Sequence, residues 1–248
     1  MFTPPENLEV IMLFYYIRHG DPVYDPDSLT KLGERQAEAA AKRLALHGLD
    51  RIYASTSNRA LCTAKPTAEM LNMEVVPLDF TSEVYTWDEF TIGLGEDKHW
   101  IFEDTEMRKL FHQPDVRALG ENWYEHPAFA GHDFGKGIQR IYRESDRFFE
   151  SLGYQHLDHT GCYKVIKHSD ERIALFAHQG FGLAFLSCLL DIPYPQFTTH
   201  FDMCHTGITV IDFPEEDGYA IPCVRMLSSD GHIYREGLPT KYRNKFYI

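Results

Sequence analysis

Apolar residues along this chain gather into short continuous runs, and these runs alternate with segments of helical periodicity. The run from Val10 to Ile17 is rich in Ile, Val, Phe and Tyr and predicts a buried β-strand. Residues 51–54 and 74–78 predict two more short strands, and apolar residues recur at helical spacing between the strands. This strand–helix–strand order is typical of a parallel sheet with crossover helices. We therefore expect an α/β fold.

Turn-forming and helix-capping residues indicate where the first elements begin and end. Residues 21–28 contain several Asp and Pro residues and predict a loop after the first strand. Thr30 is a suitable cap for a helix that continues to about Gly48. A second helix is expected from about Arg59 to Leu71, and Pro66 either kinks it or marks a broken start.

A long segment of weak periodicity follows the third predicted strand. Residues 84–137 contain all three tryptophans, and we expect them to form a partly helical insertion over the C-terminal ends of the strands. No linker or repeat divides the chain, so we predict a single domain over residues 1–248 with its insertion at about 84–137. The elements expected after the insertion are a helix at 138–152, strands at 162–167 and 172–177 joined by a turn, a helix at 180–190, and a hairpin of strands 207–213 and 219–227.

Polar residues stand where three of the predicted strands end. Arg18 and His19 follow the first strand, Arg59 begins the helix after the second strand, and His178 follows the strand at 172–177. Taken singly, each residue is as readily explained by solvent exposure or ordinary core hydrogen bonding. The carboxyl ends of neighbouring parallel strands meet at one edge of a sheet, however, so the four side chains are expected to converge. Such a cationic cluster in an acidic protein indicates an anion site.

The first of these strand ends has the most versatile chemistry. His19 can act as a nucleophile or a proton carrier, because imidazole changes charge near neutral pH. Arg18 offers a planar fork that matches phosphate or carboxylate, and Gly20 allows a sharp turn or a close approach to a ligand.

The overall composition excludes several classes of function. The net charge of −13 argues against general affinity for nucleic acid or for an anionic membrane. The five cysteines form no C-x-x-C pair, so neither a disulfide framework nor a zinc site is indicated, and a reducing cytoplasm is the expected location. Glu6 and Glu9 precede the first apolar run, and no apolar stretch reaches about 18 residues, so we expect no signal peptide and no membrane span.

Several motifs, in this order and spacing, resemble the histidine phosphatase superfamily, in the branch that includes phosphoglycerate mutases. The resemblance implies a three-layer α/β/α sandwich with a mixed, mainly parallel sheet. It covers residues from about 11 to 83 and from 172 to 212, whereas most of the insertion is not covered. The motifs are Arg18-His19-Gly20, residues 29–37 at the start of the first helix, residues 54–60 with Thr63-Ala64, Glu83, and residues 177–180 around His178.

The resemblance also implies a phosphohistidine mechanism without a metal or another cofactor. His19 would attack phosphorus, and Glu83 would protonate the leaving oxygen and then activate water. Arg18, Arg59 and His178 would bind the phosphate oxygens. The expected ligands are a small phosphorylated substrate and inorganic phosphate, and a homodimer is left open as an assembly.

Two departures from the family pattern bear on the choice of reaction. Asp21-Pro22 and Asp25 stand where many members have other residues, which leaves the phosphate contacts on that side open. Glu83 is followed by Val84-Tyr85-Thr86-Trp87 and not by the Arg-His-Tyr-Gly that is typical of mutases. We therefore favour a phosphomonoesterase, with a phosphoglycerate mutase and a non-catalytic phosphate-binding module as alternatives.

The aromatic residues of the insertion permit two interpretations. They could form an apolar wall for an organic leaving group, but core packing is the commoner role of such residues. The residues concerned are Trp87, Phe90, Trp100, Trp123 and Tyr124.

Overall fold

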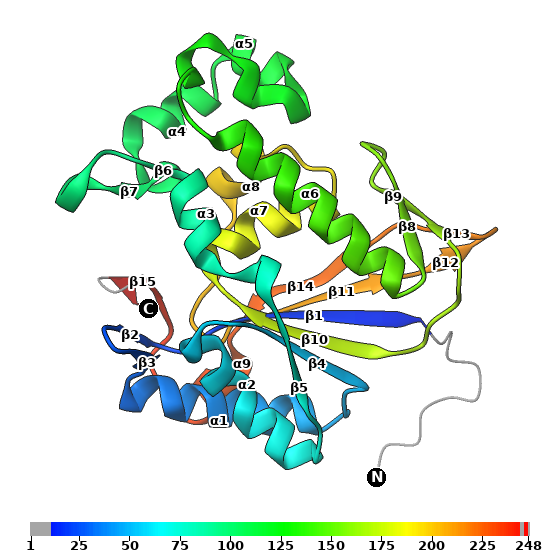
Figure 1. The fold of residues 1–248 in the computed structure, drawn as a ribbon. Coiled ribbons are helices and arrows are strands. Elements are labelled where there is room, and N and C mark those ends of the chain that lie inside the picture. The colour runs from blue at the N-terminus through cyan, green and yellow to red at the C-terminus, as the bar shows by residue number, and fades with distance from the viewer. Residues whose placement is uncertain (1–10, 244–245, 248) are drawn as a thin grey trace.

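A central six-stranded sheet organises the protein (Figure 1). The computed structural model describes residues 11–243 and 246–247. Four of the strands are parallel neighbours, and β11 runs antiparallel to both strands beside it. The predicted mixed, mainly parallel sheet is therefore confirmed. In spatial order the strands are β14 (Cys223–Ser229), β11 (Ile208–Phe213), β1 (Met12–Arg18), β10 (Arg172–Ala177), β4 (Arg51–Ser55) and β5 (Val75–Leu78).

Two crossover helices connect the first three parallel strands, as the apolar spacing predicts. Helix α1 (Lys31–Ala45) begins where the Thr30 hydroxyl accepts a hydrogen bond from the Gly33 N–H, and it buries a row of alanines. Helix α2 (Asn58–Leu71) includes Pro66 and ends at Asn72 in a left-handed conformation. The small buried faces let both helices pack closely on each other and on the sheet.

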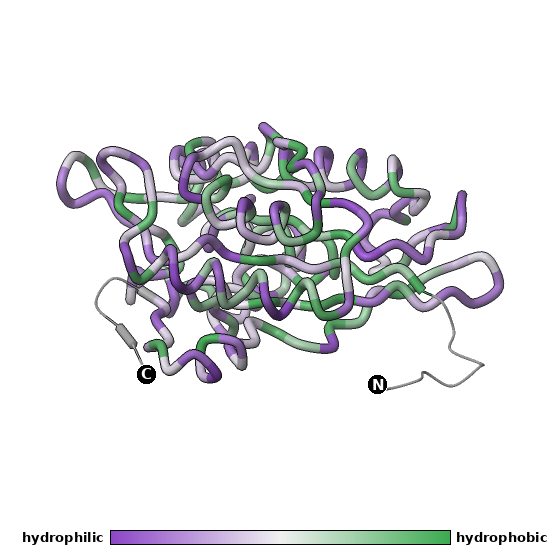
Figure 2. Tube along the Cα trace, turned by 90° about the horizontal axis from the view of Figure 1, so that it is seen from below, coloured by the Kyte–Doolittle hydropathy of each residue, from purple (hydrophilic) through white to green (hydrophobic). Residues whose placement is uncertain are grey.

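Helices cover both faces of the sheet, which confirms the three-layer sandwich (Figure 1). Helices α1, α2 and α9 (Gly231–Arg235) lie on one face. Helices α6 (Phe134–Ser151), α7 (Gln179–Leu189) and α8 (Tyr194–His200) lie on the other, and α7 is buried on all sides. Along α1 and α6, hydrophilic and hydrophobic residues alternate with the helical turn, as Figure 2 shows for the outer layers.

The insertion stands over the ends of the parallel strands beside α3 (Glu83–Glu89) (Figure 1). Trp123 and Phe90 are fully buried in an aromatic cluster with Tyr194, so core packing is their role. The short helix η1 (Asp79–Thr81) precedes α3. The further elements of the insertion are β6 (Thr91–Ile92), η2 (Gly95–Asp97), β7 (His99–Trp100), η3 (Ile101–Glu103), α4 (Thr105–Phe111), α5 (Pro114–Ala118), η4 (Gly120–Glu125) and η5 (Pro127–Phe129).

Several predicted limits are wrong. Residues 21–28 contain a short hairpin of β2 (Pro22–Tyr24) and β3 (Asp27–Leu29). Helix α6 begins four residues before the predicted Ile138, because Phe134 is also buried. Helix α8 follows Pro193 and was not predicted.

The two strands predicted at 162–167 and 172–177 do not pair with each other. The first, β9 (Cys162–Val165), pairs with β8 (Tyr154–Leu157) and β13 (Tyr219–Ala220) in a small separate sheet, to which β12 (Glu215–Glu216) also belongs. The predicted C-terminal hairpin forms between β11 and β14, and β12 and β13 lie in its connection. Strands β15 (Lys241–Arg243) and β16 (Phe246–Tyr247) pair near the chain end.

Two remaining expectations concern the first residues of the chain and membrane-spanning segments. Val10, Glu6 and Glu9 lie outside the described residues, so β1 is described from Met12. Among the residues that the structure describes, no helix is both long and apolar enough to cross a membrane.

Candidate active site

The parallel pairing of β1 with β10 brings the two predicted histidines together. Arg18 lies opposite Ala177 in the register, so the next residues, His19 and His178, leave the sheet side by side. Their ring centroids are 5.3 Å apart. The convergence that the strand order predicts is therefore present in the structure.

The ring of His19 is held in one orientation by its own turn. Its Nδ1 lies 2.8 Å from the carbonyl oxygen of Gly20, so Nδ1 carries the proton that the carbonyl accepts, and the lone pair resides on Nε2. Burial, the neighbouring His178 and the cation of Arg18 hold the pKa of His19 well below its usual value. His19 is therefore a neutral imidazole with a nucleophilic Nε2 at neutral pH.

Gly20 is needed for the tight packing of this turn against α1. A Cβ atom on Gly20 would lie 2.7 Å from the carbonyl oxygen of Gly33, which is closer than atoms can approach. The N–H of Gly20 donates to the Thr63 hydroxyl at 3.0 Å. His19 thus lies on a turn that is fixed by contacts with two helices.

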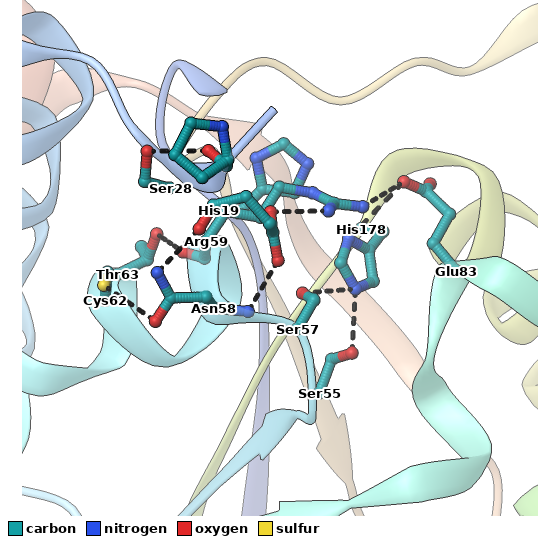
Figure 3. Close-up of polar contacts among 12 residues, drawn as sticks. His19, Ser28, Ser55, Ser57, Asn58, Arg59, Cys62, Thr63, Glu83 and His178 are labelled. Atoms are coloured by element: carbon teal, nitrogen blue, oxygen red, sulfur yellow. Dashed lines mark hydrogen bonds and ion pairs between the residues drawn. The ribbon is translucent and has the colours of Figure 1, made fainter. Parts of the chain in front are cut away.

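The ring of His178 is held from below by two serines (Figure 3). Its Nε2 lies 2.8 Å from the Ser55 hydroxyl and 3.2 Å from the Ser57 hydroxyl. Burial lowers the pKa of His178 to about 4, against the opposing effect of Glu83. The hydroxyls can donate to Nε2, which leaves the ring proton on Nδ1, on the side of Glu83.

Arg59 and Glu83 form a contact above the ring of His178 (Figure 3). Nη2 of Arg59 donates to Oε2 of Glu83 at 3.0 Å, and the backbone N–H of Gly180 donates to Oε1 at 3.0 Å. Glu83 is the first residue of α3, so the insertion begins at this carboxylate. Oε2 also lies 3.5 Å from Nδ1 of His178.

Arg18 is buried behind the same cavity. Its Nη1 donates to the carbonyl oxygens of Met203, at 2.6 Å, and Tyr242, while its Nε is buried with no hydrogen-bond partner. An unpaired guanidinium nitrogen in the interior is costly unless a ligand satisfies it. All five predicted site residues therefore meet at one place.

Sequence reasoning missed an acidic residue at this place. The Asp27 carboxylate accepts from Nη1 of Arg59 at 2.9 Å and from the backbone N–H of Asn58 at 2.7 Å, at the start of α2. Asp25, one of the departures from the family pattern, is exposed at the turn between β2 and β3. The hairpin pairing of Tyr24 with Asp27 directs the later aspartate inward, and nothing in the local sequence indicates this.

A buried polar group behind His19 was also missed. His205 stacks on His19 with ring centroids 5.8 Å apart, and its Nδ1 lies 3.4 Å from Oδ1 of Asp21. Lys241 and Thr30 bind the Asp21 carboxylate at 2.7 Å each. The sequence did contain a signal for His205, because this residue lies just before the predicted strand at 207–213. When that strand pairs antiparallel with β1, the residues just before it lie beside the C-terminal end of β1.

These contacts affect the protonation of Asp21 and of His205. Burial raises the pKa of Asp21, but hydrogen bonds from His205, Lys241 and Thr30 outweigh burial and lower it below its usual range. Burial and the Arg18 cation lower the pKa of His205 to about 4. The network therefore places a charged carboxylate and a neutral ring behind His19.

The site includes a set of atoms that resembles a metal site. One ligand atom from each of His19, Glu83 and His178 lies within 4.8 Å of the others. The guanidinium groups of Arg18 and Arg59 border the same cavity, and their charges repel a cation and attract an anion. The arrangement therefore fits an anion better than a metal ion.

A cavity of about 580 Å³ lies elsewhere, beside α6. Near it, Nδ1 of His156 lies 2.8 Å from Asp146 and Nε2 lies 3.0 Å from Asp191. These hydrogen bonds outweigh burial and raise the pKa of His156 to about 9. Both ring nitrogens are used in joining β8 to α6 and to the end of α7, so this group has a structural role.

The site opens into a cavity of about 790 Å³ beneath the insertion. Its lining includes Arg18, Arg59 and Glu83 together with Trp87 and Trp100. Two aromatic residues of the insertion thus line the cavity, while the remaining aromatics of the insertion pack elsewhere, and core packing is the role that the sequence favoured.

A sandwich that gathers two arginines, two histidines and a carboxylate at one sheet edge is typical of proteins that handle phosphate groups. Residues 14–222 match the histidine phosphatase superfamily (branch 1), and the chain belongs to this family. A curated relative is phosphoserine phosphatase 1 of Hydrogenobacter thermophilus, which is 28% identical over 152 residues, or 61% of this chain. The match spans 64% of the length of that relative.

Solved structures show the same fold at low identity. Phosphoserine phosphatase from Entamoeba histolytica, in complex with 3-phosphoglyceric acid, is 19% identical with a TM-score of 0.58, over 90% of this chain and 100% of that one. A mycobacterial glucosyl-3-phosphoglycerate phosphatase in complex with inorganic phosphate is 19% identical with a TM-score of 0.54, over 89% and 98%.

Proposed function

We propose that this protein is a phosphomonoesterase that hydrolyses a small phosphorylated metabolite through a phosphohistidine intermediate. The observation that carries the proposal is the fixed orientation of His19, whose Nδ1 is bound to the Gly20 carbonyl and whose Nε2 keeps its lone pair. An imidazole with this tautomer beside two guanidinium groups is suited to attack phosphorus. We further propose that residues 1–248 act as one domain.

In the first step, Nε2 of His19 attacks phosphorus, and the bond from phosphorus to the leaving oxygen breaks. Protonated Glu83 gives its proton to the leaving oxygen, so an alcohol departs and phosphoryl remains on His19. Gly180 and Arg59 hold Glu83 in place by hydrogen bonds to its two carboxylate oxygens. The leaving group therefore departs toward the insertion.

In the second step, water attacks phosphorus from the side that the alcohol vacated. Glu83, now a carboxylate, takes a proton from this water, and the bond from Nε2 to phosphorus breaks to release inorganic phosphate. His19 is regenerated as a neutral ring and Glu83 as an acid. The same carboxylate serves both steps because both exchanges occur at one oxygen position.

The charge of the transferred phosphoryl group is balanced by the chain itself. The guanidinium groups of Arg18 and Arg59 border the cavity, and Nδ1 of His178, which has no hydrogen-bond partner, lies on the side of Glu83. Donors that are in position before the reaction stabilise a phosphoryl transition state without reorganising. This supports catalysis without a metal ion, since the positive charge is supplied by side chains.

Acid-labile labelling tests the proposal. Incubation with a phenyl phosphate carrying labelled phosphorus, followed by quenching in alkali, should trap one phosphoryl group that is stable in alkali and labile in acid. His19→Ala should abolish the label and lower kcat at least about 1,000-fold. His168→Ala is the matched control, because His168 is an exposed histidine far from the cavity, and it should leave both unchanged.

The alternatives give different results in the same assay. A mutase would transfer the label to an isomeric phosphorylated acid and release little phosphate to water. A non-catalytic module would bind inorganic phosphate but form no labelled enzyme with any substrate of a broad panel. Unchanged turnover by His19→Ala would contradict the proposed function.

A further inference from the structure

The position of Glu83 fixes where the leaving group of a substrate must lie. Under the proposed function, Glu83 donates its proton to the leaving oxygen, so the organic part of the substrate extends beyond this carboxylate. The cavity continues there for a total of about 790 Å³, a size suited to a ligand much larger than phosphate. Its lining beyond Glu83 therefore contacts the organic part.

Trp100 forms a rigid wall in this region. A Cβ atom on Gly180 would lie 2.4 Å from the Cη2 atom of Trp100, so the indole rests directly on the residue whose N–H binds Glu83. The indole also stacks on Phe102 with an interplanar angle of 18°. Trp100 is thus held in place before any substrate arrives, which reduces the entropy lost on binding.

Trp87 completes a corner with Trp100. The two rings are 4.9 Å apart at an interplanar angle of 84°, so one indole presents its edge to the face of the other. Val84, with 67% of its surface exposed, lies one residue after Glu83 and lines the same cavity. An aromatic guest in such a corner can stack on one ring and meet the other edge to face.

Polar groups at this end of the cavity already have partners within the insertion. Lys98 lies 3.1 Å from a carboxylate oxygen of Asp88 and 5.4 Å from the centre of the Trp87 ring. The ring nitrogens of His99 lie 2.6 Å from the Asp97 carbonyl and 3.1 Å from the Asp104 carboxylate. The unsatisfied surface in this part of the lining is therefore mostly aromatic.

We propose that the preferred substrates are phosphate monoesters whose leaving alcohol carries an aromatic ring, with Trp87 and Trp100 forming the subsite for that ring. This inference rests on the proposed function, because it uses Glu83 as the proton donor to the leaving oxygen. It goes beyond that function by assigning the class of substrate and two residues that determine specificity.

Alkyl phosphates with similar leaving alcohols test the inference. 2-Phenylethyl, 2-cyclohexylethyl and ethyl phosphate differ in the group that reaches the corner, while each loses a primary alcohol. For the wild type, kcat/KM should be at least tenfold higher for 2-phenylethyl than for ethyl phosphate, with the cyclohexyl ester between them. Equal values for the three esters would overturn the inference, while their hydrolysis would still support the proposed function.

Variants of Trp87 connect the preference to the corner. Trp87→Ala should reduce the ratio of kcat/KM for 2-phenylethyl over ethyl phosphate to under threefold, while Trp87→Phe should retain most of this ratio. Tyr234→Ala is the control, because Tyr234 is an aromatic residue that is 85% exposed and is not part of the cavity lining. An equal loss on all esters in Trp87→Ala would overturn the assigned role.

One measurement needs no variant. 2-Phenylethylphosphonate should inhibit hydrolysis of ethyl phosphate by the wild type with a Ki at least tenfold below that of ethylphosphonate, and equal Ki values would contradict the subsite. Absence of turnover for every ester, together with absence of phosphohistidine, would instead refute the proposed function.

Discussion

The carboxylate of Asp27 lies 2.9 Å from Nη1 of Arg59, and its second oxygen accepts the first backbone N–H of α2. A phosphate group would accept hydrogen bonds from the same two donors, the Arg59 guanidinium and the N-terminus of α2. In the ligand-free protein, therefore, a side chain of the β2–β3 hairpin competes for the group that is expected to bind substrate.

Asp27→Asn should strengthen phosphate binding, because it removes a negative charge from Arg59 but keeps an oxygen that caps α2. We expect the Ki of inorganic phosphate or vanadate to fall about fivefold, as for a partly screened charge pair. Inhibition assays at constant ionic strength measure it. Asp25→Asn, at an exposed turn residue of the same hairpin, is the matched control and should change little. Weaker binding in Asp27→Asn would mean that Asp27 orients Arg59 for the ligand.

His19 should remain neutral in the ligand-free protein at pH values where an ordinary histidine is charged. Burial lowers its pKa, and a lowered pKa keeps the neutral form present as pH falls through 6.5. NMR of ring nitrogens between pH 5 and 7 should show an unchanging Nδ1–H tautomer. His168 serves as an internal reference, since the hydrogen bond to Glu215 raises its pKa and it should titrate above 6.5. Protonation of His19 near 6.5 would contradict its assigned environment.

Lys241 should contribute to the free energy of unfolding through its ion pair with Asp21. Its ammonium group binds the buried Asp21 carboxylate at 2.7 Å, and Lys241→Met leaves that charge without its partner. We expect the free energy of unfolding to fall by about 2 kcal/mol. Denaturant titration measures it, and adding Asp21→Asn to Lys241→Met should recover part of the loss.

The exposed pair of Lys31 with Glu34 provides the comparison. The Lys31 ammonium group lies 2.8 Å from a carboxylate oxygen of Glu34, but the Lys31 side chain is almost fully exposed. Lys31→Met should therefore change the free energy of unfolding far less than Lys241→Met does. Equal effects of the two lysine substitutions would show that burial of Asp21 is not what makes its pair important.

His156 should make stability depend on pH in the alkaline range. Its folded pKa of about 9 is above the unfolded value of about 6.5, so its contribution is complete below pH 6.5 and is lost as pH rises through 9. The difference in unfolding free energy between wild type and His156→Gln should be on the order of 2 kcal/mol at pH 6 and decrease toward pH 9.5. A difference that does not change with pH would exclude a charged His156.

The sequence predicts the central elements well because local and tertiary preferences agree there. Strand β1 is buried on both faces and reads as one apolar run, and the Thr30 cap fixes the start of α1. Arg18, His19, Arg59 and His178 could be placed together because parallel register alone brings strand ends to one edge.

The β2–β3 hairpin could not be predicted in the same way. It has only three residues in each strand, and its contacts with α2 depend on Asn58, whose side-chain amide donates to the Asp27 carbonyl and whose backbone N–H donates to the Asp27 carboxylate. Strand β9 is similar in part, since one of its two partners, β13, lies far from it in the sequence, whereas β8 directly precedes it. In the insertion, Phe90 and Trp87 are only three residues apart, yet one is core and the other lines the cavity.

Glu83 is both the proposed proton donor and the first residue of the insertion, and this has a consequence for how the protein can diversify. Under the proposed function, the residues that would bind phosphate come from the sheet edge and α2, whereas Val84, Trp87 and Trp100 belong to one continuous stretch that starts directly after Glu83. Exchange of residues 84–103, with the buried Phe90, Ile101 and Phe102 retained, would then replace the proposed leaving-group pocket as a unit. The range of substrates would change by recombination of one short segment, while the proposed phosphoryl-transfer residues are inherited unchanged.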